Sequence, residues 1–185
     1  MQTFAVYVDN KPGVLNRVAS LFRRRAFNIE SLTVGHTEIA GLSRMTIVVN
    51  TDERGGRLVE ANLYKLIPVR RVDNITRVPT IGRDLAMIKI AATGDARTQV
   101  MQLVDVYRSR IVDVSPESLV IETTGTEDKI DSLLEVLRPY GVIEMVRTGR
   151  VEMARGSIAQ PPISAPRRSA AAADDGRDDV GNCSV

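Results

Sequence analysis

The chain has 185 residues, and its 25 Lys and Arg residues nearly balance 23 Asp and Glu residues, giving a formal net charge of +2. One histidine, His36, and one cysteine, Cys183, are too few for a His/Cys metal cluster or for an internal disulfide. The apolar runs fall short of the ~20 residues that a membrane span needs, and the start has no secretion signal. Aromatic residues make up only 4%, which disfavours stacking on nucleobases, so we expect a cytoplasmic protein that binds neither membranes nor nucleic acid.

The first half of the chain, residues 3–79, is predicted to form one βαββαβ unit. Its strands are expected where apolar and β-branched residues alternate, at 3–8, 28–37, 43–50 and 69–78. Its two helices are expected where apolar residues recur at helical spacing, at 14–26 and at 56–67, and Pro68 stops the second.

Residues 83–155 repeat this order of elements. Strands are predicted at 84–92, 111–115, 119–125 and 142–151, and helices at 96–110 and 126–138. The predicted fold class is therefore α+β, with two tandem ferredoxin-like modules, in each of which helices cover one face of a four-stranded antiparallel sheet. Because such a sheet leaves one face and its edges open, we expect a dimer or a larger complex.

Residues 156–185 differ in composition from both modules. They are rich in Pro, Ala and Asp, contain no aromatic residue and have no apolar periodicity, so we predict a disordered tail. Cys183 lies in this tail, and we assign it no catalytic role because a reactive thiol needs a structured electropositive neighbourhood.

The segment that joins the first strand to the first helix, Asp9 to Leu15, carries the most informative motif. Gly13 has no Cβ, so a ligand can approach the free amides that open the helix, where the helix dipole favours a carboxylate. This arrangement predicts a cradle for a small anion. The alternative is an ordinary strand-to-helix loop in which Pro12 fixes φ and Gly13 makes the turn, and the spacing alone does not choose between the two.

Asn28 and Ile29 begin the second predicted strand. An amide side chain next to an apolar one can bind the polar end of a ligand beside an apolar wall. In the simpler interpretation, Asn28 only completes the turn after the helix, where it tolerates the left-handed conformation. His36 lies where this strand meets its turn, and we interpret it as a surface histidine rather than as a metal ligand.

Three stretches resemble the small, regulatory subunit of acetohydroxyacid synthase, also called acetolactate synthase: VDNKPGVLNRV (8–18), RRRAFNIESLTVG (23–35) and LSRMTI (42–47). In the second half, YRSRIVDV (107–114) and Arg147-Thr148-Gly149 resemble the C-terminal domain of the same family. The resemblance implies that residues 3–79 form an ACT domain, a ferredoxin-like unit that binds amino acids at interfaces between copies.

The resemblance also implies a chain without an active site, a metal or a cofactor of its own. Small subunits of this family activate a catalytic large subunit, which carries thiamine diphosphate, Mg²⁺ and FAD and condenses pyruvate with a second 2-oxo acid. They also confer feedback inhibition by valine on this first committed step of branched-chain amino acid biosynthesis, which leads to valine, leucine and isoleucine. By elimination, residues 83–155 are expected to supply much of the contact with the catalytic subunit.

The effector of this family lies between two copies of a homodimer. The resemblance assigns it to Asn10, Gly13, Val14 and Leu15 of one copy and to Asn28 and Ile29 of the other. Amides near Gly13 would hold the carboxylate, asparagine carbonyls the ammonium, and apolar neighbours the isopropyl group. A hydrophobic pocket separates valine from leucine or isoleucine by only ~1–3 kcal/mol, so the preferred branched-chain amino acid stays open.

Two other functions are compatible with ferredoxin-like modules. A freestanding ACT-type sensor would regulate a different enzyme or transcription, and it would occur without a thiamine-diphosphate partner. A small ferredoxin-like enzyme would need a nucleophile or an acid–base pair, and we find no such group in the sequence of either module.

Overall fold

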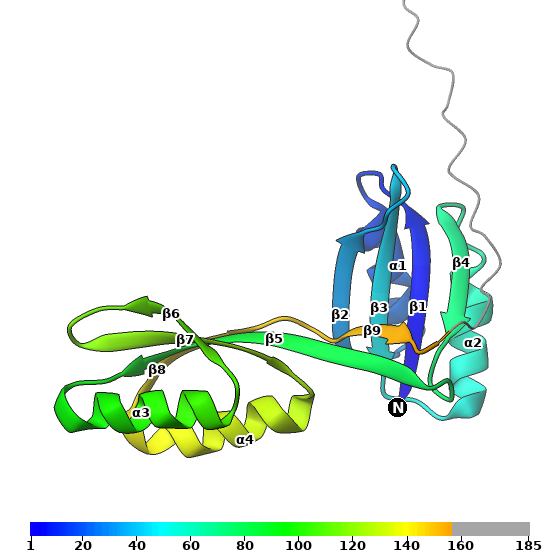
Figure 1. The fold of residues 1–185 in the computed structure, drawn as a ribbon. Coiled ribbons are helices and arrows are strands. Elements are labelled where there is room, and N and C mark those ends of the chain that lie inside the picture. Colours follow the sequence, from blue (N-terminus) through cyan, green and yellow to red (C-terminus); the bar gives the residue numbers. More distant parts are fainter. Residues whose placement is uncertain (157–185) are drawn as a thin grey trace, which may run out of the picture.

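The computed structural model describes residues 1–156, which form two α+β modules joined by a long two-stranded ribbon (Figure 1). Apart from Gly156, the predicted tail and its Cys183 lie outside the described residues. Each module packs two helices on an antiparallel sheet, so the predicted fold class is confirmed. None of the helices within residues 1–156 is long and apolar enough to cross a membrane.

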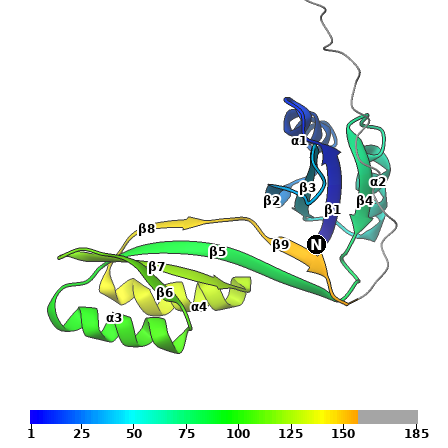
Figure 2. The same cartoon turned by 45° about the horizontal axis from the view of Figure 1, so that its top comes forward.

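The elements of the first module are, in chain order, β1 (Gln2–Asp9), α1 (Val14–Arg24), β2 (Ile29–His36), β3 (Leu42–Val49), α2 (Glu53–Leu63) and β4 (Val69–Asn74). The sheet order is β2-β3-β1-β4, and all neighbouring strands are antiparallel. Both helices lie on one face of this sheet (Figure 2). β2 is therefore an edge strand, and its outer side pairs with no strand of the described chain.

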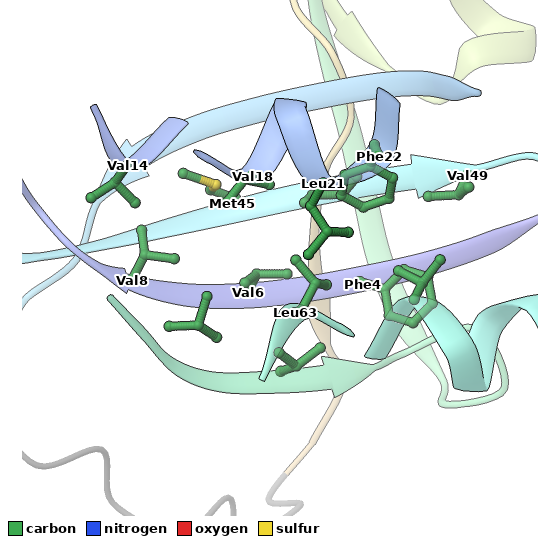
Figure 3. Close-up of a cluster of buried hydrophobic side chains, with 14 residues drawn as sticks. Phe4, Val6, Val8, Val14, Val18, Leu21, Phe22, Met45, Val49 and Leu63 are labelled. Atoms are coloured by element: carbon green, nitrogen blue, oxygen red, sulfur yellow. The ribbon is translucent and has the colours of Figure 1, made fainter. Parts of the chain in front are cut away.

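The core of the first module lies between this sheet and its helices (Figure 3). Alternate residues of β1, namely Phe4, Val6 and Val8, are fully buried on the helix-covered face, and Ala5 on the other face of the strand is buried too. The first three share the core with Val18 and Phe22, which are four residues apart and so lie on one side of α1. The apolar spacing in the sequence thus fixes which face of each element is buried.

The helix boundaries differ from the prediction for local reasons. α1 ends at Arg24, two residues early, because Ala26 takes a left-handed φ of +56° that cannot continue the helix. α2 begins at Glu53, three residues early, because Asp52 caps it by accepting a hydrogen bond of 2.7 Å from the amide of Gly55.

The elements of the second module are β5 (Thr80–Ala91), α3 (Gly94–Val106), β6 (Arg110–Val114), β7 (Ser118–Gly125), α4 (Glu127–Leu137), the short 3₁₀ helix η1 (Arg138–Tyr140), β8 (Val142–Arg147) and β9 (Val151–Ala154). The order of the main sheet is β6-β7-β5-β8, which has the same antiparallel plan as the first module. Its core includes Ile88 and Ile90 of β5, Ile121 of β7 and Leu133 of α4.

The predicted strand 142–151 is instead two strands, β8 and β9, separated by residues 148–150. β8 pairs with the second half of β5, whereas β9 pairs with its first four residues, Thr80 to Arg83. This pairing extends β5, which begins four residues earlier than predicted. The resulting ribbon carries β9 to the open face of the first sheet, where the Arg44 side chain of β3 donates a hydrogen bond to the carbonyl of Glu152 (Figures 1 and 2).

Candidate effector-binding site

Asp9, the last residue of β1, anchors the loop that leads into α1. Its carboxylate is buried and accepts two hydrogen bonds from Arg70 of β4, at 2.6 Å from Nε and 3.0 Å from Nη2. Lys11 Nζ lies 3.6 Å from the same carboxylate. The hydrogen bond from Arg70 lowers the pKa of Asp9 below its ordinary value, so the carboxylate stays ionised and fixes the start of the loop.

Gly13 is the N-cap residue of α1, and its φ of +81° is in the left-handed region. A glycine adopts this conformation without steric cost, and no atom lies within 4 Å of the place where a Cβ would be. No side chain caps α1, and its first turn holds no acidic residue. The first-turn amides of α1 are therefore not satisfied by a side chain and favour an external anion, whereas those of α2 are capped by Asp52.

Asn10 lies in the exposed part of this loop. Its amide donates a hydrogen bond of 2.8 Å to the carbonyl of Gly41, which ties the loop to the turn between β2 and β3. Its side-chain Nδ2 lies 3.4 Å from Nδ1 of His36, at the end of β2. His36 is exposed, as expected, but it borders the candidate site, and no local sequence signal could reveal this contact between residues 26 positions apart.

Val14 and Leu15 form the first turn of α1 and face different environments. The Val14 side chain is 6% exposed and belongs to the first core, and its amide donates a hydrogen bond of 3.4 Å to the carbonyl of Lys11. The Leu15 side chain is 46% exposed and offers an apolar surface beside the helix N-terminus. The structure thus gathers Asn10, Gly13, Val14 and Leu15 at one end of α1.

Asn28 and Ile29 lie at the other end of α1, where the chain enters β2. The exposed Asn28 side chain donates a hydrogen bond of 2.6 Å to Glu30, while Ile29 is half-buried against the first core. The left-handed residue after the helix is Ala26 rather than Asn28, so Asn28 is not needed for that turn conformation.

The predicted site residues therefore form two groups that one chain does not bring together. α1 has 11 residues, so its ends are about 16 Å apart. A ligand the size of an amino acid cannot reach both groups within one chain. Both can contribute to one site only if a second copy supplies the other group.

A groove of about 620 Å³ lies on the face of the first sheet that is opposite to α1 and α2, between this sheet and β9. The guanidinium groups of Arg44 and Arg71 lie over the ring of Tyr7, at 5.8 and 5.6 Å from its centroid. None of the six predicted residues lines this groove. Arg44 already donates to Thr46 and to the carbonyl of Glu152, and Arg71 pairs with Asp73, so both cations are engaged within the protein.

No group of three or more His, Cys, Asp or Glu side chains that could hold a metal ion occurs among residues 1–156. Among the four α-helices within residues 1–156, α1 alone has neither a side-chain cap nor an acidic residue in its first turn, and its N-terminus lies next to an exposed asparagine and an exposed leucine. Such a combination suits a ligand with a carboxylate, a hydrogen-bonding cation and a small apolar side chain.

These features define a protein of two ferredoxin-like modules, with a candidate small-molecule site in the first. Residues 4–71 match the family model described as an AHAS small subunit-like ACT domain, and residues 83–156 match the model for the small subunit of acetolactate synthase. The chain belongs to the family of acetolactate synthase small subunits. This membership sets aside the freestanding sensor of another enzyme or of transcription considered above.

Individual relatives agree with the family models. A probable acetolactate synthase small subunit of Archaeoglobus fulgidus is 50% identical over 155 residues, which cover 84% of this chain and 97% of the relative. The acetolactate synthase small subunit of Bacillus subtilis is 44% identical, with coverage of 81% and 88%. The crystal structure of the small subunit from Thermotoga maritima aligns with a TM-score of 0.81 at 40% identity, covering 85% of this chain and 98% of that one.

Proposed function

We propose that this chain activates the catalytic large subunit of acetolactate synthase and makes it sensitive to inhibition by valine. In this proposal residues 3–79 bind the effector and form the homodimer, and residues 83–155 contact the catalytic subunit. The chain itself does no chemistry and works in the cytoplasm. Thiamine diphosphate, Mg²⁺ and FAD belong to the catalytic partner. The observation that carries the proposal is the uncapped N-terminus of α1 at Gly13, beside Asn10.

The topology of the first module supports a dimer through β2. An edge strand presents unpaired backbone groups, and an antiparallel pair of β2 strands around a two-fold axis would satisfy them. β2 starts near the C-terminal end of α1 and ends beside the loop that precedes α1, where His36 meets Asn10. Antiparallel pairing would therefore bring Asn28 and Ile29 of the second copy close to the Asn10 loop of the first.

Valine has the groups that this composite site would bind. Its carboxylate would accept hydrogen bonds from the first-turn amides after Gly13, with help from the helix dipole. Its ammonium would donate to the side-chain carbonyls of Asn10 and of Asn28 from the second copy. Its isopropyl group would contact the exposed side chain of Leu15 and the half-buried side chain of Ile29.

The pKa shifts among the described residues belong to ion pairs that hold the fold. Within residues 1–156, the lowered pKa of Asp9 and the raised pKa of Arg70 arise from their hydrogen-bonded ion pair, which holds the loop in place. Arg147 is likewise paired with Asp84. Structural ion pairs of this kind perturb pKa values without any catalytic role.

Reconstitution tests the proposal directly. The purified chain is mixed with the catalytic subunit, and acetolactate formation is measured with and without valine. We expect the rate to rise on addition of the chain and to fall again with valine, while the chain alone has no turnover. A catalytic subunit that was unaffected by the chain, or a complex that ignored valine, would refute the corresponding part of the proposal.

A further inference from the structure

The two modules meet where the segment between β8 and β9 crosses β2. The amide of Arg150 donates a hydrogen bond of 2.9 Å to Oγ of Ser31, and Oγ1 of Thr33 donates one of 2.6 Å to the carbonyl of Arg150. Ser31 and Thr33 are two residues apart and so lie on the same face of β2. Both backbone polar groups of Arg150 are thus bound by the edge strand of the ACT module.

Gly149 allows this close approach. A Cβ at Gly149 would lie 2.6 Å from Oγ of Ser31 and 3.2 Å from both the carbonyl of Leu32 and Oγ1 of Thr33. The φ of Gly149 is not in the left-handed region, so the contact with β2, rather than the backbone conformation, requires glycine here. A larger residue would displace either the segment or the Ser31 hydroxyl that binds Arg150, and it would crowd the carbonyl of Leu32.

The same segment is held by the second module. Nη2 of Arg150 lies 2.8 Å from Oε2 of Glu127 in the first turn of α4. The amide of Thr148 donates a hydrogen bond of 2.9 Å to the carbonyl of Leu85 in β5. Glu127 is more than half exposed, so its ion pair with Arg150 adds little stability by itself, but Arg147 at the end of β8 also contacts α4, at 3.9 Å from Glu127 and 3.0 Å from Asp131. Arg150 therefore contacts β2 through its backbone and α4 through its side chain.

β2 also begins with the predicted effector residues. A β-bulge between Ile29 and Ser31 breaks the usual alternation, so that Ile29 packs against the helix-covered core while Ser31 binds Arg150 on the open face. The bulged residue, Glu30, accepts the hydrogen bond from Asn28. The residues expected to bind the effector and the residues that bind the segment are thus separated by one bulged position.

We propose that residues 148–150 form a strap that transmits effector binding from β2 to α4 and β5 of the second module. The inference rests on the proposed function, because it takes Asn28 and Ile29 to bind the effector. Effector binding fixes the conformation at the start of β2. Through the bulge, this alters the positions of Ser31 and Thr33. These two residues then move Arg150 and, through its side chain, the N-terminus of α4.

Gly149→Ala in the full chain tests the strap. Calorimetry measures the Kd of valine for the chain, and the reconstituted holoenzyme gives the valine concentration for half-inhibition. We expect Kd to stay within about twofold of wild type while the half-inhibitory concentration rises at least about fivefold, the lower end of typical coupling between sites. Gly82→Ala is the matched control: it lies on the same ribbon, its added Cβ would have no atom closer than 3.6 Å, and it should behave as wild type.

Arg150→Met is a second variant, which removes the contact with Glu127 but keeps both backbone bonds to β2. It should also raise the half-inhibitory concentration of valine without changing Kd. If Gly149→Ala unfolds, Arg150→Met alone tests whether the strap transmits effector binding. Wild-type inhibition in folded strap variants would overturn the strap, as would a parallel loss of valine binding. If wild type itself neither binds nor responds to valine, the proposed function fails and the strap fails with it.

Discussion

Replacing Gly13 by aspartate tests the anion cradle at the start of α1. The left-handed φ of +81° costs an aspartate ~1–2 kcal/mol. Relative to glycine at the same N-cap position, an aspartate gains only a few tenths of a kcal/mol from hydrogen bonds between its carboxylate and the first-turn amides. The surrounding space is open, so no steric clash adds to the cost of the left-handed φ. We expect the free energy of unfolding to fall by about 1–2 kcal/mol.

Effector binding should respond much more strongly than stability. The new carboxylate would lie at or beside the position of the effector's carboxylate, and two unit charges 4 Å apart repel by about 4 kcal/mol at an effective dielectric of 20. That repulsion corresponds to a roughly thousandfold loss of affinity for valine. Gly13→Asn is the matched control, since asparagine has the same shape and also caps helices but carries no charge. Competition of its side-chain oxygen for the amides should weaken binding about tenfold or less.

Calorimetric titration of valine into each purified variant measures the affinities, and urea unfolding measures the stabilities. An aspartate variant that bound valine as tightly as the asparagine variant would refute the cradle, because no carboxylate would then lie at the N-terminus of α1. If both variants bound valine with unchanged affinity, Gly13 would not be part of the effector site.

Two further predictions concern stability. Valine at a hundredfold excess over Kd should stabilise the isolated chain by ~2.7 kcal/mol, about 5–10 °C in Tm, and a melting curve that did not move at millimolar valine would count against a site in the free dimer. Asp9→Asn should destabilise the chain by about 1–3 kcal/mol at neutral pH, since it takes the charged partner from Arg70. Because the pKa of Asp9 is lowered, its stabilisation is fully present above the ordinary value of 3.8 and is lost as pH falls through the folded-state pKa. The difference between wild type and Asp9→Asn in urea unfolding should therefore shrink below about pH 4, and a difference that grew in acid would contradict the role of the pair.

Much of the candidate site follows from local sequence, but its geometry does not. The glycine before α1 and the apolar residues after it are adjacent in the chain, so their shared position at a helix start was predictable. The contact between Asn10 and His36 depends on how β2 folds back beside the loop, which no local pattern encodes. The placement of the two groups of site residues at opposite ends of α1 follows from the element order, and it requires a second copy if both groups hold one ligand.

The sequence by itself determined the two βαββαβ units, because apolar periodicity over a few residues predicts which side chains are buried. Examples are Phe4, Val6 and Val8 in the first module and Ile88 and Ile90 in the second. Only the tertiary structure divided the predicted strand 142–151 into β8 and β9. Strand continuity there depends on pairing between Thr80 and Ala154, and on the fit of Gly149 against Ser31. These contacts join residues more than 70 positions apart, so neither propensity nor spacing can specify them.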